Sequence, residues 1–175
     1  KVKNAILISS GFSEAGNIKE EKKIVDYARS RGLRILGPNV FGVYSSEARL
    51  NATFVSGKIP SGHLSMITQS GALGLTLVGQ ASVENIGLSA IVSVGNKSDI
   101  DESDLLTYLC DHEPTRIILM YIEGIRNGEK FIKAVRNAAL KKPVVVIKSG
   151  RSSKGAQAAA SHTGSLAGSD EVFDD

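Results

Sequence analysis

The sequence has few of the residues on which several classes of protein depend. Its only cysteine is Cys110, so the chain cannot form an internal disulfide framework, and this fits a reducing cytoplasm. Tryptophan is absent and aromatic residues make up 5% of the chain, so stacking of nucleic-acid bases is not expected. No apolar run approaches the roughly 20 residues that span a bilayer. These features predict a cytoplasmic α/β protein with no membrane or nucleic-acid partner.

Net charge and nucleotide-loop motifs are also scarce. The formal charge is +3, with lysine and arginine spread along the chain, which is too weak and dispersed to indicate nucleic-acid binding. No Walker-type glycine–lysine loop is present, so ATP is not expected to bind by that route. The acidic cluster in residues 99–104 lacks the glycine and terminal glutamate of a calcium loop, and it is predicted to begin a helix instead. No metal site is predicted.

Short apolar runs alternate with segments of helical period. Residues 4–9 predict a strand buried on both faces, followed by an amphipathic helix over 18–31 and a short strand over 33–36. Residues 40–58 alternate weakly, so a β-hairpin or an extended arm is expected there. The sequence Pro60-Ser61-Gly62 is typical of a linker, and a domain boundary is predicted at this point.

A second cycle of alternation follows the linker. Its strands are rich in isoleucine and valine and are predicted over 64–68, 88–94, 116–122 and 144–147. The intervening helices are predicted over 71–85, 102–110 and 128–140. This pattern predicts a parallel sheet with right-handed crossovers and helices on both faces.

The ends of these strands carry small or polar residues. Ligands of such sheets gather at the carboxyl ends of the strands. Many of the 18 glycines lie there, where backbone turns sharply or approaches a ligand. The strand ends read Ser9-Ser10-Gly11, Gly37-Pro38-Asn39, Gln69-Ser70-Gly71, Gly95-Asn96, Glu123-Gly124 and Ser149-Gly150. This row predicts the rim of a binding site.

Residues 151–175 consist mainly of small residues without a strand or helix stripe, so a mobile segment is predicted, centred on His162. No cysteine, histidine or aspartate lies near His162 at metal-ligand spacing, which disfavours a zinc site. A neutral imidazole on an uncrowded loop can attack phosphorus if a partner fixes its tautomer. An ordinary solvated loop histidine is the alternative, and spacing alone leaves both open.

Two strand ends could assist such a histidine. Glu123 ends an apolar strand at the sheet edge, where its carboxylate could accept the second ring N–H. The alternative is a capping or surface glutamate, which is frequent at strand ends. Ser70, Gly71 and Ala72 begin a helix whose free N–H groups and positive dipole end suit a phosphoryl group. Ser70 could serve only as an N-cap.

The remaining histidines and the cysteine are given no chemical role. His63 precedes a strand and His112 follows a helix, so both are expected on the surface. Cys110 ends an amphipathic helix and is expected in the core, because no basic residue is evidently paired with it.

Five segments in one order resemble the ADP-forming acetyl-CoA synthetases and, more distantly, the α subunit of succinyl-CoA synthetase. The resemblance covers essentially the whole chain. The segments are the histidine loop at 161–168, the strand end at 121–125, the helix start at 67–74, the loop at 93–97 and the acidic helix start at 101–106.

This resemblance implies a division of the chain and a set of site residues. Residues 1–58 correspond to the C-terminal half of a CoA-binding Rossmann-like domain, 61–150 to a flavodoxin-like CoA-ligase domain, and 151–175 to a mobile phosphohistidine segment. The residues expected to contact CoA are Ile8, Ser9, Ser10 and Asn39. Those expected to bind phosphate are Ser70, Gly71, Ala72, Gly95 and Asn96.

Two positions depart from the family pattern. Val40 stands where a cysteine usually follows Gly-Pro-Asn, so a contact near the CoA thiol is expected to differ. Leu75 stands where the succinate enzymes carry tyrosine, which favours acetate or another small or apolar acid over succinate.

The implied reaction is the reversible conversion of acyl-CoA, ADP and phosphate into acid, ATP and CoA through a phosphohistidine at His162, held by Glu123. ATP or ADP and Mg²⁺ would bind an ATP-grasp partner, either a β subunit or a fused domain, and an oligomer is expected. The chain is therefore expected to be a fragment or a subunit. The alternative is a non-catalytic acyl-CoA-binding regulatory module, as in some protein acetyltransferases, and the presence of both His162 and Glu123 favours the enzyme.

Overall fold

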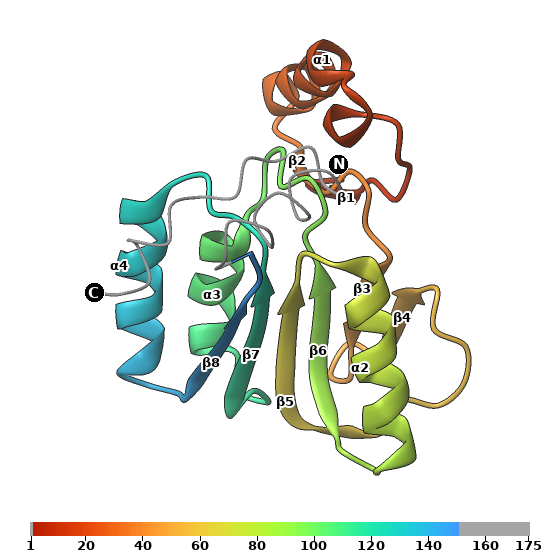
Figure 1. The fold of residues 1–175 in the computed structure, drawn as a ribbon, viewed down its shortest axis with the longest axis vertical. Coiled ribbons are helices and arrows are strands. Elements are labelled where there is room, and N and C mark those ends of the chain that lie inside the picture. The colour runs from red at the N-terminus through yellow and green to blue at the C-terminus, as the bar shows by residue number, and fades with distance from the viewer. Residues whose placement is uncertain (1, 151–175) are drawn as a thin grey trace.

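The computed structural model describes residues 2–150, which form two unequal sheets (Figure 1). The elements of the smaller unit are β1 (Asn4–Ile6), the 3-10 helix η1 (Ser13–Ala15), α1 (Ile18–Ser30) and β2 (Arg34–Leu36). β1 and β2 pair in parallel, with Ala5 opposite Ile35. The helix predicted over 18–31 is present, and it buries Val25 and Ala28 on one stripe.

β1 is not buried on both faces, and that prediction was wrong. Ile6 and Ile8 are exposed. Within residues 2–150, β1 pairs with β2 alone, and α1 packs against β2, so one edge of β1 is open. The strand also ends at Ile6, earlier than predicted, and residues 7–10 continue beyond it as a loop.

The larger sheet has six strands in the order β4-β3-β6-β5-β7-β8. Its strands are β3 (Gly42–Ser45), β4 (Leu50–Thr53), β5 (Ser61–Thr68), β6 (Leu88–Ser93), β7 (Ile117–Ile122) and β8 (Val144–Lys148). The last four run parallel to one another, as predicted. Their carboxyl ends point towards the smaller unit, as the arrowheads in Figure 1 show.

The expected hairpin forms, but it belongs to the larger sheet. β3 pairs antiparallel with β6, placing Tyr44 opposite Ile91. Phe41 and Tyr44 are buried in the core under α2, and burial of these two rings explains why the hairpin joins this sheet. The chain passes from the smaller to the larger sheet between β2 and β3. The predicted domain boundary at Pro60-Ser61-Gly62 stays a prediction.

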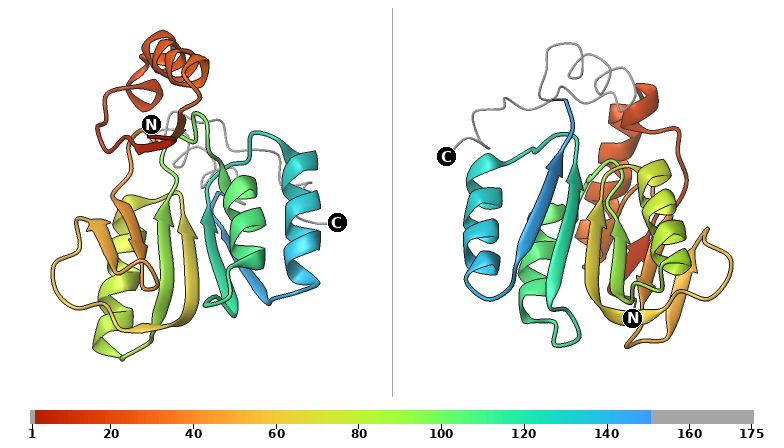
Figure 2. Two further views of the ribbon diagram at one scale, coloured as in Figure 1. Left: turned by 180° about the vertical axis from the view of Figure 1, so that it is seen from behind. Right: turned by 60° about the horizontal axis from the view of Figure 1, so that its bottom comes forward.

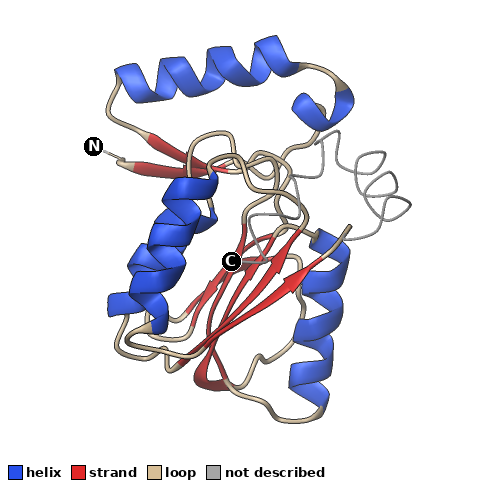
Figure 3. Ribbon diagram, turned by 60° about the vertical axis from the view of Figure 1, so that its left-hand side comes forward, coloured by secondary structure: helices blue, strands red, loops and turns tan. Residues whose placement is uncertain are grey.

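Helices cover both faces of the larger sheet, as predicted (Figures 2 and 3). The helices are α2 (Gly71–Val83), α3 (Glu102–Asp111) and α4 (Gly128–Ala139). Val78 of α2 belongs to one buried cluster, while Leu106 of α3 and Phe131 of α4 belong to the other. None of the helices within residues 2–150 has the length and apolar character needed to cross a membrane.

The two units are joined through the carboxylate of Asp99, in the loop between β6 and α3. Its Oδ1 accepts from Arg29 Nη2 at 2.6 Å, and its Oδ2 accepts from Arg34 Nε at 2.9 Å and from Ile35 N at 2.8 Å. The side chain is 1% exposed. Burial alone would raise the pKa of Asp99, but the hydrogen bonds from Ile35, Arg34 and Arg29 outweigh it and hold this pKa below its usual value.

We expect Asp99→Asn to lower the free energy of unfolding at pH 7 by about 1–3 kcal/mol, because the charge that pairs both arginines is lost. The lowered pKa of Asp99 means that its contribution is present above the unfolded-state pKa and is lost as the pH falls through the folded-state pKa. The wild type should therefore lose more stability than the variant between pH 7 and pH 3.

Urea unfolding at a series of pH values measures both effects. Asp26→Asn is the matched control, because Asp26 is exposed on α1 and, within residues 2–150, forms an ion pair with the neighbouring Lys22 alone. Equal stability and equal pH dependence of the Asp99 and Asp26 variants would show that Asp99 does not hold the two units together.

Candidate functional site

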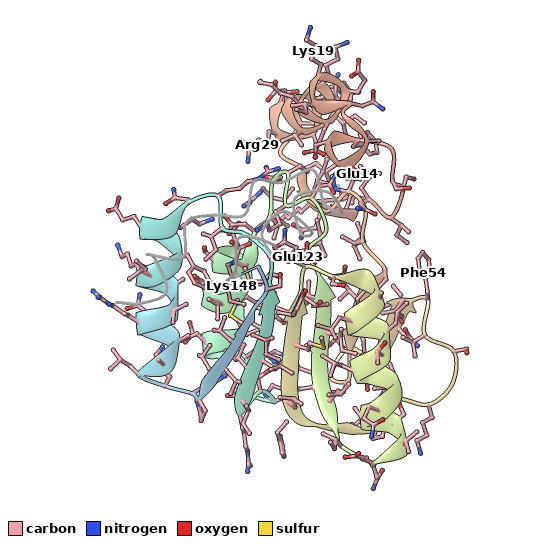
Figure 4. The ribbon with its side chains drawn as sticks, in the orientation of Figure 1. Glu14, Lys19, Arg29, Phe54, Glu123 and Lys148 are labelled. Atoms are coloured by element: carbon pink, nitrogen blue, oxygen red, sulfur yellow. The ribbon has the colours of Figure 1, made fainter. Side chains whose placement is uncertain are left out.

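A cavity of about 790 Å³ lies where the carboxyl ends of the strands face the smaller unit. Both units contribute to its wall. The polar lining residues are Ser9, Ser10, Asn39, Gln69, Ser70 and Glu123. The apolar and small ones are Ile8, Val40, Phe41, Phe54, Gly71, Ala72 and Leu75. Figure 4 shows Glu123 at the end of the sheet that faces the smaller unit, and Phe54 beside the hairpin.

Most of the predicted site residues come together in this cavity. The four residues expected to contact CoA line it, together with Ser70, Gly71 and Ala72 of the predicted phosphate site and with Glu123. They come from positions 8 to 123 of the chain, so only the fold brings them together. His162 lies outside the described residues.

The start of α2 presents polar backbone groups to the cavity. Ser70 caps the helix, and its Oγ accepts from Leu73 N at 3.3 Å, as the N-cap interpretation predicts. The N–H groups of Gly71 and Ala72 belong to the first turn, which has no intrahelical acceptors for them. With the positive end of the helix dipole, they make this wall of the cavity suitable for an anion.

Glu123 lies in a turn whose backbone is hydrogen-bonded to Gln69, the residue just before the N-cap of α2. The side-chain oxygen of Gln69 accepts from Glu123 N at 3.0 Å and from Gly124 N at 3.2 Å. The backbone N–H of Gln69 donates to Tyr121 O at 3.0 Å. Gln69 directly precedes the N-cap Ser70, so one residue links the Glu123 turn to the helix start.

Gln69, Phe41 and Phe54 line the site without having been assigned a role from the sequence. The position of Gln69 at a strand end was the only local signal for it. Phe41 directly precedes β3 and Phe54 directly follows β4, so the two lie together at the open end of the hairpin, where Phe54 N donates to Phe41 O at 3.2 Å. Their place in the wall depends on the pairing of the hairpin with β6, which local periodicity does not report.

Gly95 and Asn96 do not line the cavity. The Asn96 amide donates to Glu21 Oε2 at 2.8 Å and to Glu14, and its oxygen accepts from Asn39 Nδ2 at 3.3 Å. Asn96 therefore joins the two units, and phosphate binding by this pair stays a prediction. Gly95 has a φ of +52°, and a Cβ there would lie 2.1 Å from Pro38 O, so only glycine fits this approach.

The prediction that His112 lies on the surface was wrong. Its ring is buried, with Nδ1 2.8 Å from Thr115 Oγ1 and Nε2 3.1 Å from Glu47 Oε2. Glu47 belongs to the turn between β3 and β4, so the hairpin covers this histidine. His63 is exposed and Cys110 is buried, as predicted. Residues 2–150 contain no cluster of three or more histidine, cysteine, aspartate or glutamate side chains that could hold a metal.

The fold and the cavity define a flavodoxin-like α/β domain with a candidate ligand site at the carboxyl edge of a parallel sheet. Residues 61–175 match the family described as the succinyl-CoA ligase like flavodoxin domain, and the chain belongs to this family. The family resemblance predicted from the five motifs is confirmed.

Several relatives match almost the entire chain. The α subunit of acetate–CoA ligase [ADP-forming] I from Pyrococcus furiosus is 55% identical over 98% of the chain, and the acetate–CoA ligase [ADP-forming] from Methanocaldococcus jannaschii is 46% identical over 99%. The chain spans only 38% and 24% of these relatives.

A solved structure of an acetyl-coenzyme A synthetase is also similar to the chain. It is the dinucleotide forming acetyl-coenzyme A synthetase 1 of Ca. Korarchaeum cryptofilum in complex with phosphate and ADP, with a TM-score of 0.94 and 50% identity. The match covers 99% of this chain and 38% of the solved one. An ATP citrate lyase from Methanosaeta concilii shares the fold alone, with a TM-score of 0.67 at 16% identity.

We expect Gly95→Ala to destabilise the protein by about 1–3 kcal/mol, because the new Cβ meets Pro38 O and the backbone has a positive φ. Gly79→Ala is the matched control, since Gly79 lies in α2 with open space around its Cβ position. The control should be stabilised by about 0.5–1 kcal/mol. Thermal unfolding of both variants measures the difference, and equal melting temperatures would contradict the close approach of the two loops.

Proposed function

We propose that the chain is the CoA- and phosphate-binding part of an ADP-forming acyl-CoA synthetase, which converts acyl-CoA, ADP and phosphate reversibly into acid, ATP and CoA. One observation carries this proposal. A single cavity collects the residues expected to contact CoA, the start of α2 and Glu123. The reaction requires that the thioester, the phosphate and the phosphoryl acceptor be held within reacting distance of one another, so their binding residues must line the same space.

The first step joins phosphate to the acyl group. A phosphate oxygen attacks the thioester carbonyl carbon, the C–S bond breaks, and CoA leaves as the thiolate, so that an acyl phosphate forms. No lysine or arginine lines the described cavity. Among the described lining residues, the N–H groups of Gly71 and Ala72 and the hydroxyl of Ser70 are placed to stabilise the phosphate.

The second step moves the phosphoryl group to His162. The unprotonated ring nitrogen attacks phosphorus, the P–O bond to the acyl group breaks, and the carboxylate leaves. Glu123 accepts the N–H of the other ring nitrogen, which fixes the tautomer and stabilises the charged phosphohistidine. The phosphoryl group then passes to ADP in an ATP-grasp domain, where a bound Mg²⁺ would supply neutralisation of the phosphate charges.

The length of the relatives supports a further domain or subunit in the whole protein. The chain spans 38% of the Pyrococcus α subunit and 24% of the Methanocaldococcus enzyme, which leaves room for further domains in the whole protein. The ATP-grasp partner is then either a fused domain or a β subunit, and we expect the complete enzyme to be oligomeric.

The acid is a monocarboxylate with a small or apolar acyl group. Val40, Phe41, Phe54 and Leu75 form an apolar part of the cavity wall. A second carboxylate would lie against this wall without a cationic partner, because no lysine or arginine lines the described cavity. This disfavours succinate and supports acetate or a somewhat larger apolar acid.

We expect the full protein, incubated with γ-labelled ATP, Mg²⁺ and its ATP-grasp domain, to take up acid-labile, alkali-stable label, and His162→Asn to take up none. With acyl-CoA and labelled phosphate as the donors instead of ATP, Glu123→Gln should lower the rate of His162 labelling about 10- to 100-fold, because the imidazole loses its orienting acceptor. His63→Asn and Glu129→Gln are the controls, since both residues are exposed and neither lines the cavity.

Equal labelling of the wild type and His162→Asn would contradict the phosphohistidine. A protein that binds acyl-CoA but takes no label with an active ATP-grasp partner would instead support the regulatory acyl-CoA-binding module. CoA-dependent thermal stabilisation of His162→Ala distinguishes retained binding from lost folding.

We also expect kcat/KM for acetate or another short apolar acid to exceed that for succinate by about 100-fold or more, because the second carboxylate would be buried unpaired. A series of acids assayed with CoA and ATP measures this ratio. Similar values for succinate and acetate would show that the apolar wall does not select the acid.

A further inference from the structure

A buried lysine lies beneath the turn that carries Glu123. Lys97, in the loop after β6, is 5% exposed, and its Nζ is 3.2 Å from Oε2 of Glu102, which is 3% exposed. Burial lowers the pKa of Lys97, against the attraction of Glu102. A buried ion pair is seldom more stable than apolar residues of the same size, so stability alone does not explain this pair.

The backbone of Lys97 adds a second unfavourable feature. Its φ is +54°, in the left-handed region that costs residues other than glycine about 1 kcal/mol or more. Hydrogen bonds hold this conformation, because Lys97 N donates to Val94 O at 3.0 Å and Arg126 Nη1 donates to Lys97 O at 3.0 Å. Backbone strain of this kind persists only where the surrounding structure fixes the residue, and such residues cluster at functional sites.

The Lys97 ammonium binds the carbonyl of Gly124, the residue that follows Glu123. It donates to the carbonyl oxygen of Gly124 and to Gln69 Oε1, the latter at 3.4 Å. The same Gln69 oxygen accepts the N–H groups of Glu123 and Gly124. The Glu123 turn is therefore held on its carbonyl side by Lys97 and on its N–H side by Gln69.

We propose that Lys97 is a positioning residue for phosphoryl transfer, which fixes the Glu123 turn relative to the start of α2 through Gly124 and Gln69. This inference rests on the proposed roles of Glu123 and of Ser70 in that reaction. The carboxylate must meet one side of an imidazole while the helix start binds the phosphoryl group on the other. An error of about 1 Å between the two can lower the rate about 100-fold.

The test uses Lys97→Met in the full protein with its ATP-grasp domain. Methionine keeps the length and the burial of the side chain but cannot donate hydrogen bonds. We expect the single-turnover rate of His162 phosphorylation from acyl-CoA and labelled phosphate to fall about 10- to 100-fold, with KM for CoA changed less than about twofold. Lys130→Met is the matched control, because Lys130 also pairs with acids of the α3 start but is exposed. Its rate should be unchanged.

A second variant tests whether the loss of rate in Lys97→Met comes only from loss of folding. Lys97→Met/Glu102→Leu deletes both buried charges, so it should fold as stably as the wild type or better, yet show the same loss of phosphorylation rate. Hydrogen exchange of the Gly124 N–H should be faster in both variants than in the wild type and Lys130→Met.

The pH profile gives a readout that a purely structural role would not move. The charged groups around Lys97 are Glu102 and Asp101 of the α3 start and Arg126 of the β7–α4 loop. Glu102→Gln removes the main opposing attraction and lowers the pKa of Lys97 further. The rate of this variant should therefore decline at a lower alkaline pH than that of the wild type.

The outcomes separate the two proposals. A wild type that takes no label on His162 overturns the proposed function and this inference with it. A labelled wild type with Lys97→Met or the double variant labelled at the same rate overturns this inference alone. So does a rate loss accompanied by an equal loss of CoA binding, which would indicate general damage to the site.

Discussion

The joint between the smaller unit and the larger sheet centres on one buried carboxylate, that of Asp99. Its backbone belongs to the loop after β6, while Arg29, Arg34 and the Ile35 N–H that it binds all belong to the smaller unit. A carboxylate that is 1% exposed is tolerated only with several charge-assisted hydrogen bonds. Together with the hydrogen bonds from the Asn96 amide to Glu14 and Glu21, this joint holds the smaller unit, and with it residues 8–10, against the larger sheet.

The chemistry of the site is divided among elements that meet only at this edge. The α2 start supplies N–H groups for an anion, the end of β7 supplies Glu123, and the hairpin contributes Phe41 and Phe54 to an apolar wall. A parallel sheet makes this division possible, because the carboxyl ends of all its strands lie on one side. Polar and apolar walls then face one space, which suits a ligand with a charged end and an apolar end.

The sequence predicted the regular elements well where the signal was local. The helix predicted over 102–110 is α3 (Glu102–Asp111), and the approach of Glu123 to Ser70 followed from the rule on strand ends. The errors concern contacts between distant residues. The hairpin joins the larger sheet through Tyr44 and Ile91, and it covers His112 through Glu47. Periodicity within a dozen residues carries no information on such pairs.

The sequence did not predict a positioning role for Lys97 for a related reason. Its polar neighbours in the sequence are typical of an ordinary loop. The loop over residues 94–101 in fact combines three constrained features: the Gly95 approach to Pro38, the left-handed Lys97 and the buried Asp99. Asp99 holds the wall that carries the residues expected to contact CoA, and Lys97 holds the turn that carries Glu123. Because these two residues are separated by a single position, thioester cleavage and histidine phosphorylation would share one geometric support. Each costly constraint would then be retained for the half of the proposed reaction that it positions, Asp99 for the wall expected to contact CoA and Lys97 for the Glu123 turn.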